Sequence, residues 1–270
     1  MFGLLFLQVM SSGRTTAQGN LLLLPRRVIF EGAKRYEELN LANTGKDTAR
    51  YVISLMHIRM KEDGGFEEIS QPDSGERFAD RFIRFFPHSV ELGPGESQVV
   101  KIQLTKANEL EPGEYRSHLY FRAIPDKPLL GEEKPVTDSG ISIRLVPVFG
   151  ISIPVIIRVG TPSTQVRISD LAVQMEEDTI PILSMTFHRA GNVSVYGDIS
   201  VYYTSASGKT TAVGTAKGIA VYTPNAARSF RLTLDKSSAI NYHSGKLSVE
   251  YKTGEDNNPV RIAGADLSLR

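Results

Sequence analysis

A run of alternating apolar residues from Ile141 to Val159 is the clearest pattern in this chain. Every odd position of the run is apolar, whereas the even positions are mixed. A period of two is typical of a β-strand whose odd side chains share one face. Strands usually have about 5–6 residues, yet this run could extend roughly 60 Å at about 3.3 Å per residue. One small sandwich needs less than that, so the surplus apolar edge predicts contact with another protein.

Shorter runs of the same kind precede it, separated by turn-forming residues. No helical period competes with them in this half of the chain. The expected strands cover residues 21–30, 36–43, 50–60, 82–92, 98–105 and 115–124. The polar, acidic segment 64–80 and the charged segment 126–139 are expected to be loops. Short strands at this spacing are typical of an immunoglobulin-like β-sandwich.

The pattern restarts after the turn-forming segment Gly160–Ser163. The expected strands of this second half cover residues 166–173, 182–188, 197–203, 211–222, 227–234, 245–251 and 262–269. A chain of 270 residues is long for one domain and comfortable for two. We therefore expect an all-β protein with two domains in tandem, at residues 19–160 and 161–270.

The N-terminus has the features of a secretory signal peptide. Met1–Met10 is a short apolar run, and small and polar residues follow it up to Ala17. We therefore expect a signal peptide at residues 1–18. The run lacks a basic segment before it, and Arg14 lies close to the expected cleavage site, so an apolar lead-in to the first strand is the alternative. The run is too short to cross a bilayer, which takes about 20 apolar residues.

Composition and motifs argue against catalysis, metal binding and nucleic-acid binding. The formal net charge is +1, so no polyanionic partner is indicated, and the absence of cysteine excludes a disulfide framework and a thiol nucleophile. The five histidines are scattered without metal-ligand spacing, and no phosphate-binding loop or nucleophile elbow occurs. The glycosylation sequon at Asn192–Ser194 is interpreted as accidental. We expect no catalytic residue, no metal, no cofactor and no enzyme activity.

Four segments, taken in their order and spacing, carry a family resemblance. Arg27–Gly32 runs from a basic residue through apolar and acidic residues to glycine, and Leu92–Val100 has a Pro-Gly turn that leads into a strand. Glu114–Pro125 closes on Ile-Pro, and Val155–Arg158 closes the long alternating run. Together they resemble the periplasmic pilus-assembly chaperones of the chaperone–usher pathway. The resemblance covers the first domain, whereas the second domain fits by position and β character.

The resemblance implies two immunoglobulin-like β-sandwich domains in tandem with a cleft between them, and a location in the periplasm. Members of this family bind pilin-like subunits, which are sandwiches without their final strand, and deliver them to an outer-membrane usher. The seventh strand of the chaperone fills the gap by β-augmentation. Neither a cofactor nor membrane insertion is implied. The resemblance leaves open whether the free protein caps its own strand as a homodimer.

The donor face of that strand falls on odd positions of the alternating run. The expected donor side chains are Ile141, Ile143, Leu145 and Phe149, with Pro147 between them. The alternative is that these side chains fill the core of their own domain, which is the reading we favour for Ile151, Ile153 and Val155. Each large aliphatic side chain buried in a subunit contributes roughly 1.5–3 kcal/mol.

The family also anchors the C-terminal carboxylate of its subunit with an arginine on the first strand and a lysine on the seventh. Arg27 matches the arginine, and Arg26 would serve after a slip of one residue. Pro154 stands where the lysine is expected, so this chain departs from the family pattern. Arg144 and Arg158 share the even face with that position and are candidate substitutes.

Family members join their two domains through an arginine, a glutamate and an aspartate. Arg158 and Glu114 match the first two, and no aspartate matches the third. The resemblance therefore implies an interdomain ion pair of two members, with a solvated pair as the alternative.

The other function that fits the sequence is a two-domain β-sandwich protein of a cell surface or a secretion assembly, without chaperone activity. Its long strand would pair permanently with a neighbour in a homo-oligomer. The two functions differ in whether the odd face near residue 141 is open in the isolated monomer.

Overall fold

The computed structural model describes residues 21–125, 148–177, 179–237, 240–253 and 258–269. Its regular elements are strands and two short 3₁₀ turns, η1 (Asp80–Phe82) and η2 (Ala107–Glu109). The strands form two β-sandwiches, so the prediction of an all-β protein with two immunoglobulin-like domains is confirmed.

The first sandwich packs a four-stranded sheet against a five-stranded sheet, in the orders β1-β3-β9-β7 and β2-β11-β10-β4-β8. Its strands are β1 (Leu21–Leu24), β2 (Val28–Phe30), β3 (Tyr36–Asn43), β4 (Ala49–Met56), β7 (Ile83–Phe86), β8 (Ser89–Leu92), β9 (Ser97–Leu104), β10 (Gly113–Ile124) and β11 (Gly150–Val159). Proline divides two of the expected strands, because it cannot continue a ladder of hydrogen bonds. Pro25 lies between β1 and β2, and Pro87 between β7 and β8.

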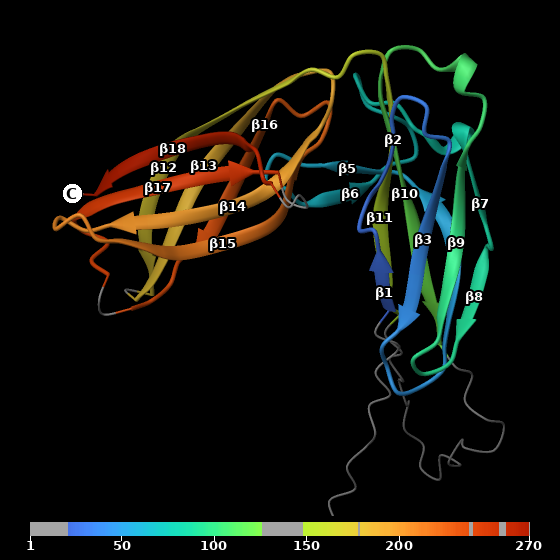
Figure 1. The fold of residues 1–270 in the computed structure, drawn as a ribbon, viewed down its shortest axis with the longest axis horizontal. Helices are drawn as coiled ribbons and strands as arrows, with labels where there is room; N and C mark the ends of the chain where they lie inside the picture. The colour runs from blue at the N-terminus through green and yellow to red at the C-terminus, as the bar shows by residue number, and fades with distance from the viewer. Residues whose placement is uncertain (1–20, 126–147, 178, 238–239, 254–257, 270) are drawn as a thin grey trace, which may run out of the picture.

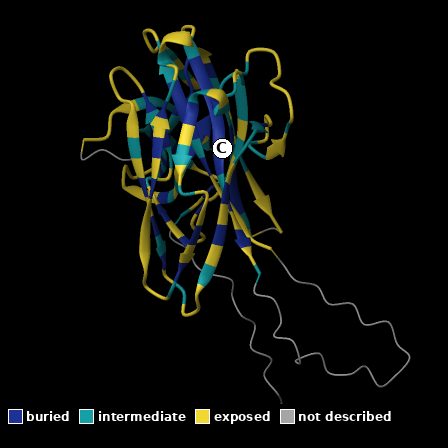
Figure 2. Cartoon of the chain, turned by 90° about the vertical axis from the view of Figure 1, so that its right-hand side faces the viewer, coloured by how far each residue is buried: buried dark blue, intermediate teal, exposed yellow. Residues whose placement is uncertain are grey.

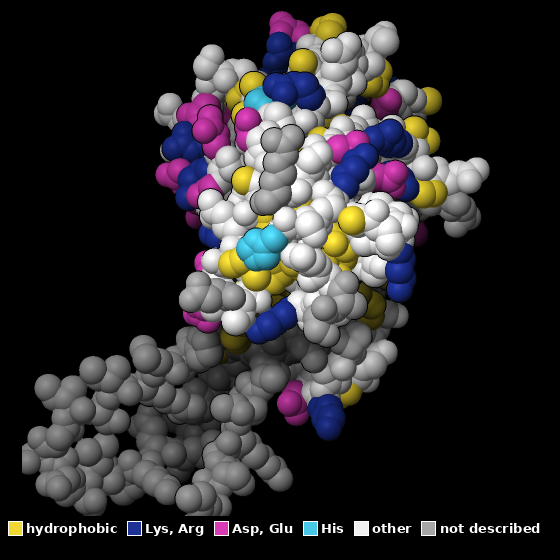
Figure 3. Space-filling model, turned by 90° about the vertical axis from the view of Figure 1, so that its left-hand side faces the viewer, with side chains coloured by type: hydrophobic (Ala, Val, Ile, Leu, Met, Phe, Trp, Pro, Cys, Tyr) yellow, Lys and Arg dark blue, Asp and Glu magenta, His cyan; other side chains and the backbone are white. Residues whose placement is uncertain are grey.

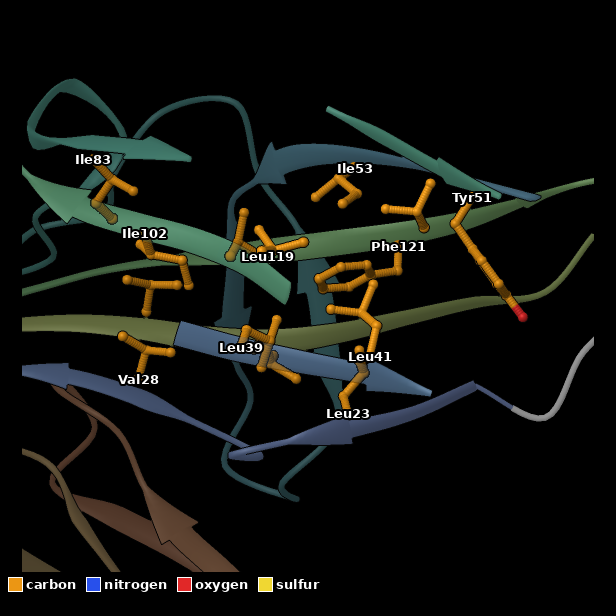
Figure 4. Packing of buried hydrophobic residues seen from close by; sticks show 14 of the residues in the cluster. Leu23, Val28, Leu39, Leu41, Tyr51, Ile53, Ile83, Ile102, Leu119 and Phe121 are labelled. Atoms are coloured by element: carbon orange, nitrogen blue, oxygen red, sulfur yellow. The ribbon is translucent and has the colours of Figure 1, made fainter. Parts of the chain in front are cut away.

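Alternate residues of both sheets fill the core of this sandwich. Leu39 and Leu41 from one sheet face Leu119 and Phe121 from the other, and all four are buried (Figure 4). The polar positions between them face outward, so buried and exposed residues alternate along the strands (Figure 2). This alternation is the physical reason that the sequence pattern predicts the strands well.

A small hairpin leaves the first sandwich and was not expected. It pairs β5 (Ile58–Met60) with β6 (Phe66–Glu68), and β6 lies inside the segment that we expected to be a loop. All three residues of β6 are exposed, so the strand has no apolar face in its sequence. Backbone pairing with β5 holds it in place, which explains why the pattern of side chains gave no sign of it.

The second sandwich packs sheets of order β12-β13-β16 and β15-β14-β17-β18 around a separate core. Its strands are β12 (Thr164–Glu176), β13 (Ile180–Gly191), β14 (Val195–Thr204), β15 (Thr210–Val221), β16 (Ala227–Thr233), β17 (Gly245–Lys252) and β18 (Arg261–Leu269). Each of them overlaps a strand expected from the alternation.

The two sandwiches meet at one end and are set at an angle, which gives the molecule an L shape (Figure 1). A small apolar cluster joins them at the corner, with Met60 and Ile156 from the first domain and Ala220 and Tyr222 from the second. The β5–β6 hairpin reaches across the same junction (Figure 1). There the Asn225 Nδ2 donates a hydrogen bond of 2.7 Å to the Met60 carbonyl. The junction therefore has its own buried contacts, beyond the covalent link between the domains.

Candidate functional site

The strand β11 has one edge that is only partly covered. It pairs with β10 in an unbroken antiparallel register from Gly150 to Val159. On its other edge, β2 pairs in parallel with the three residues from Val155 to Ile157. Within the described part of the chain, no strand pairs with this outer edge at Gly150–Pro154. An open edge with unpaired backbone groups is a template for another strand.

The register fixes which backbone groups this edge offers. The Ala123 N–H donates to the Phe149 carbonyl at 2.9 Å, so the backbone groups of odd residues face β10. Groups of even residues therefore point outward, because successive residues of a strand alternate sides. Gly150 and Ser152 each offer an N–H and a carbonyl, whereas Pro154 offers a carbonyl alone. The missing N–H of Pro154 thus falls on the open edge and breaks no bond to β10.

Apolar side chains at the start of β11 are exposed. Phe149 has an exposed fraction of 59% and Ile151 of 38%, whereas Ile153 falls to 4%. Ile153 and Val155 lie in the core of their own domain, in line with the sequence reading. Ile151 departs from that reading, because it lies where the sandwich ends. The other expected donor residues, Ile141, Ile143 and Leu145, lie outside the described residues, as does Pro147.

Arg27 lies beside the end of this open edge. It directly precedes β2, whose first residue Val28 pairs with Val155, so Arg27 is level with Pro154. Its guanidinium carbon lies 4.1 Å from the ring centroid of Tyr196 in the second domain. Its Nε is buried and has no hydrogen-bond partner. Burial is the main cause that lowers the pKa of Arg27, yet a guanidinium still keeps its charge at neutral pH.

A pocket of about 510 Å³ opens at this point between the two domains. Arg27, Ile29 and Arg158 line it from the first domain, and Ser194 and Tyr196 are among the residues that line it from the second. The cleft between the domains therefore contains two of the arginines singled out from the sequence. Arg26 is exposed and does not line this pocket.

Glu114 and Arg158 lie side by side and connect the domains. The Arg158 Nε donates to Glu114 Oε2 at 3.1 Å, and the Glu114 side chain is fully buried. Ser194 donates to the same carboxylate through its N–H at 2.9 Å and through its hydroxyl. The Thr223 hydroxyl donates to Oε1 at 3.1 Å. Two hydroxyl residues of the second domain thus complete the contacts of this carboxylate across the junction.

Arg158 and Arg27 differ in whether a carboxylate neutralises their charge. Both carboxylate oxygens of Glu114 are occupied, and they neutralise Arg158, which also lies 3.5 Å from Glu31. Among the described residues, no ion pair involves Arg27. A carboxylate in the pocket would find in Arg27 a planar group of N–H donors and a positive charge.

One cluster superficially resembles a hydrolase triad. The Ser117 Oγ lies 3.2 Å from His57 Nδ1, and His57 Nε2 lies 3.7 Å from Asp80. The Ser117 side chain is buried, and its oxygen accepts hydrogen bonds from the N–H groups of Ala79 and Asp80. Ser117 therefore holds the turn at η1, and its oxygen is not available to a substrate.

Other classes of site find little support in the described residues. No group of three or more His, Cys, Asp or Glu side chains is placed to hold a metal ion within these residues. Among the same residues, no helix has the length and apolar character needed to cross a bilayer. Basic and acidic side chains are intermixed on the face of the second domain in Figure 3. That face thus lacks the single-sign patch typical of nucleic-acid binding.

Comparisons with solved structures find chaperones of the same class that the sequence resembles. A Pseudomonas aeruginosa CupB2 chaperone is 14% identical, with a TM-score of 0.44, and the match covers 92% of this chain and 100% of that one. A chain of the CsuC–CsuE chaperone–tip subunit complex of Acinetobacter baumannii is 15% identical, with a TM-score of 0.43 and coverage of 90% and 98%. A chain of the Salmonella enterica SafA pilin–SafB chaperone complex is 14% identical, with a TM-score of 0.43 and coverage of 91% and 97%. At these identities the similarity concerns the fold alone. No family model matches the sequence, and no curated protein matches it either.

Proposed function

We propose that this chain is a periplasmic chaperone that completes pilin-like subunits with a strand of its own and delivers them to an outer-membrane usher. The observation that carries the proposal is the open outer edge of β11, which ends beside Arg27. Arg27 in turn lines the pocket between the domains. An unpaired strand edge thus lies next to a cation that could bind a carboxylate, and this supports the proposal.

The direction of β2 indicates how a subunit would bind. β2 runs parallel to β11 and starts at Val28. A guest strand in the same direction along Gly150–Ser152 would end where β2 begins, and its terminal carboxylate would meet Arg27. An antiparallel guest would bring its positively charged amino end, or continuing chain, to the same arginine. Charge complementarity therefore favours a parallel guest whose chain ends in the pocket.

Side chains on the odd face of the run supply the apolar part of the interaction. Phe149 and Ile151 are exposed at the start of β11. The preceding odd residues Ile141, Ile143 and Leu145 are proposed to continue the same face into the subunit. Burying the four expected donor side chains, Ile141, Ile143, Leu145 and Phe149, at roughly 1.5–3 kcal/mol each would give about 6–12 kcal/mol before the costs of association. Such a chaperone needs neither a cofactor nor catalysis.

Co-expression with the subunit-like products of neighbouring genes tests this function. The tagged chain is recovered from a periplasmic extract and the bound subunit is quantified. Arg27→Ala should abolish recovery, and so should Ile143→Asp combined with Leu145→Asp. Arg26→Ala is the matched control, because the adjacent arginine lies outside the pocket, and it should retain the subunit. Unchanged recovery with Arg27→Ala and with the double variant would contradict the proposal. N-terminal sequencing of the same sample tests the expected signal peptide at residues 1–18.

A second arrangement uses the same open edge. Two free copies could pair their β11 edges and shield Phe149 and Ile151 until a subunit arrives. Sedimentation across a range of concentrations would then detect a dimer that dissociates when a subunit is added. A permanent dimer that never exchanges for a subunit would instead support the alternative function, a surface or structural β-sandwich protein without chaperone activity.

A further inference from the structure

We propose that Tyr196 is a positioning residue for Arg27, so that the second domain sets up the cation of the first for a carboxylate. This inference rests on the proposed function, because it concerns the same pocket. Tyr196 belongs to β14 of the second domain, and Arg27 precedes β2 of the first. The contact that joins them crosses the junction between the domains.

The geometry is that of a cation held over an aromatic face. The guanidinium carbon of Arg27 lies 4.1 Å from the centroid of the Tyr196 ring, within the range of an effective cation–π contact. The Arg27 Nε is buried without a hydrogen-bond partner. No ion pair of the described residues involves Arg27, so within these residues the ring is the contact that best explains how the half-buried cation is held.

The ring itself is held in a fixed position. It packs against the apolar cluster of the junction, which includes Ile156 and Tyr222. On its phenol side it lies against Gly218, where an added Cβ would come within 2.9 Å of the Tyr196 Oη. Gly218 has a φ of +72°, a conformation that suits glycine and leaves room for the phenol. The ring plane therefore has little freedom to turn.

A guanidinium that lies over a ring keeps its N–H groups in its own plane, directed away from the ring, where they can donate to an anion. Stacking also opposes the repulsion from Arg158, which lies close enough to contribute to the lowered pKa of Arg27. Pro154, level with Arg27, supplies neither a cation nor an N–H to this end of the edge. One arginine must then hold a carboxylate alone, and a preorganised orientation raises its affinity.

Nuclear magnetic resonance of the Arg27 Nε–H group, with sodium acetate as the probe, tests the inference on the full chain. We expect a resonance shifted by the ring current and slow to exchange with water. This resonance should persist in Tyr196→Phe. In Tyr196→Leu it should move to the chemical shifts of the other arginines and overlap with them. Acetate should shift the backbone amide resonances of Arg27 and Val28, with an affinity about tenfold weaker in Tyr196→Leu than in Tyr196→Phe. Tyr196→Trp keeps an aromatic face and guards against a folding defect, because it should retain the resonance and give this tryptophan-free chain a single tryptophan in the pocket.

An Arg27 resonance in Tyr196→Leu that matches the unmodified protein would overturn the inference, as would equal acetate affinity in Tyr196→Leu and Tyr196→Phe. If acetate fails to bind the unmodified protein, the carboxylate pocket of the proposed function is wrong. Even then, the Arg27 Nε–H resonance, compared between Tyr196→Phe and Tyr196→Leu, would decide whether Tyr196 positions Arg27. Failure of the inference and failure of the proposed function therefore give different results.

Discussion

Removing the Glu114 carboxylate should weaken the contact between the two domains and destabilise the protein. Glu114 accepts hydrogen bonds from Arg158 and Ser194, and from Thr223 of the loop after β15. Glu114→Ala would leave Arg158 with Glu31, whose side chain is 46% exposed, as its remaining acidic partner among the described residues. Breaking a buried ion pair on one side costs about 3–5 kcal/mol, so we expect a loss of this size in the free energy of unfolding.

Glu114→Gln distinguishes the charge from the hydrogen bonds. A glutamine could keep its oxygen toward Arg158 and turn its amide toward the hydroxyls of Ser194 and Thr223, because hydroxyls also accept hydrogen bonds. Its main loss is the charge that neutralises Arg158. A hydrogen bond to a charged group contributes about 1.5–3 kcal/mol, so Glu114→Gln should destabilise the protein less than Glu114→Ala.

Urea unfolding, followed by circular dichroism and by hydrogen exchange at the Ser194 amide, measures both effects. We expect the Ser194 amide to lose protection in Glu114→Ala and to keep most of it in Glu114→Gln, because it donates to the same Glu114 oxygen as Arg158. Glu91→Gln is the matched control, since Glu91 forms a hydrogen-bonded pair with Arg50 on the surface. The reasoning is refuted if Glu114→Ala costs no more than Glu91→Gln, or if protection at Ser194 does not change.

Three further predictions concern parts of the molecule away from that pair. Burial, with help from nearby cations, lowers the pKa of His118 from 6.5 to about 3, so the unfolded chain binds one more proton between these values. The free energy of unfolding should therefore fall as the pH decreases from 6.5, by up to about 1.4 kcal/mol per pH unit. In urea titrations His118→Phe should flatten this dependence, whereas His243→Asn, at an exposed position, should leave it unchanged. Asn43→Ala should cost about 3 kcal/mol by chemical denaturation, because the Asn43 side chain donates to the buried Leu92 carbonyl and to two other carbonyls and accepts from an N–H; a change below about 1 kcal/mol would show these bonds to be marginal. Gly191→Ala should prevent the second domain from melting cooperatively, because a Cβ there would collide with the Ser163 backbone. Gly208 is the control, because it also has a positive φ, of +85°, but a Cβ there meets nothing within 4 Å. Gly208→Ala should therefore cost only backbone strain and lower the melting temperature much less than Gly191→Ala, and equal melting temperatures would refute the steric argument.

Alternation along the chain predicts the strands because both sandwiches bury one face of each strand. β3 begins and ends at Tyr36 and Asn43, as the pattern indicates, since a slip of one residue would expose Leu39 and Leu41. The proximity of Glu114 and Arg158 is instead implied by the family resemblance, because alternation alone does not set the register between two strands. They are direct partners in the ladder of β10 and β11, which are consecutive strands of the described chain.

Contacts that cross between the domains could not be predicted in this way. Ser194 and Thr223 reach Glu114 from loops of the second domain, where small hydroxyl residues carry no pattern of their own. Ser194 was visible in the sequence only as part of a sequon. Tyr196 is one of several tyrosines on alternating strands, and nothing in its neighbourhood indicates that it faces an arginine 169 positions earlier in the chain (196 − 27). Such contacts depend on how two finished domains dock, which local periodicity does not encode.

Pro154 departs from the expected anchor, and the position of Arg27 offers an explanation for this departure. At Pro154 the outer edge of β11 loses its N–H, and one residue later that edge is occupied by β2. In the proposed complex, a parallel guest strand therefore finds its last complete pair of backbone groups at Ser152. Its terminal carboxylate extends past that point, where β11 offers a carbonyl and no donor. An anion cannot stay beside a bare carbonyl, so it must take its hydrogen bonds from a group level with Pro154. Arg27 is at that level and is held by the second domain. In the proposed complex, Pro154 and the arginine beside Tyr196 would act together: the proline would end the ladder, and the arginine would draw the end of the guest chain into the pocket.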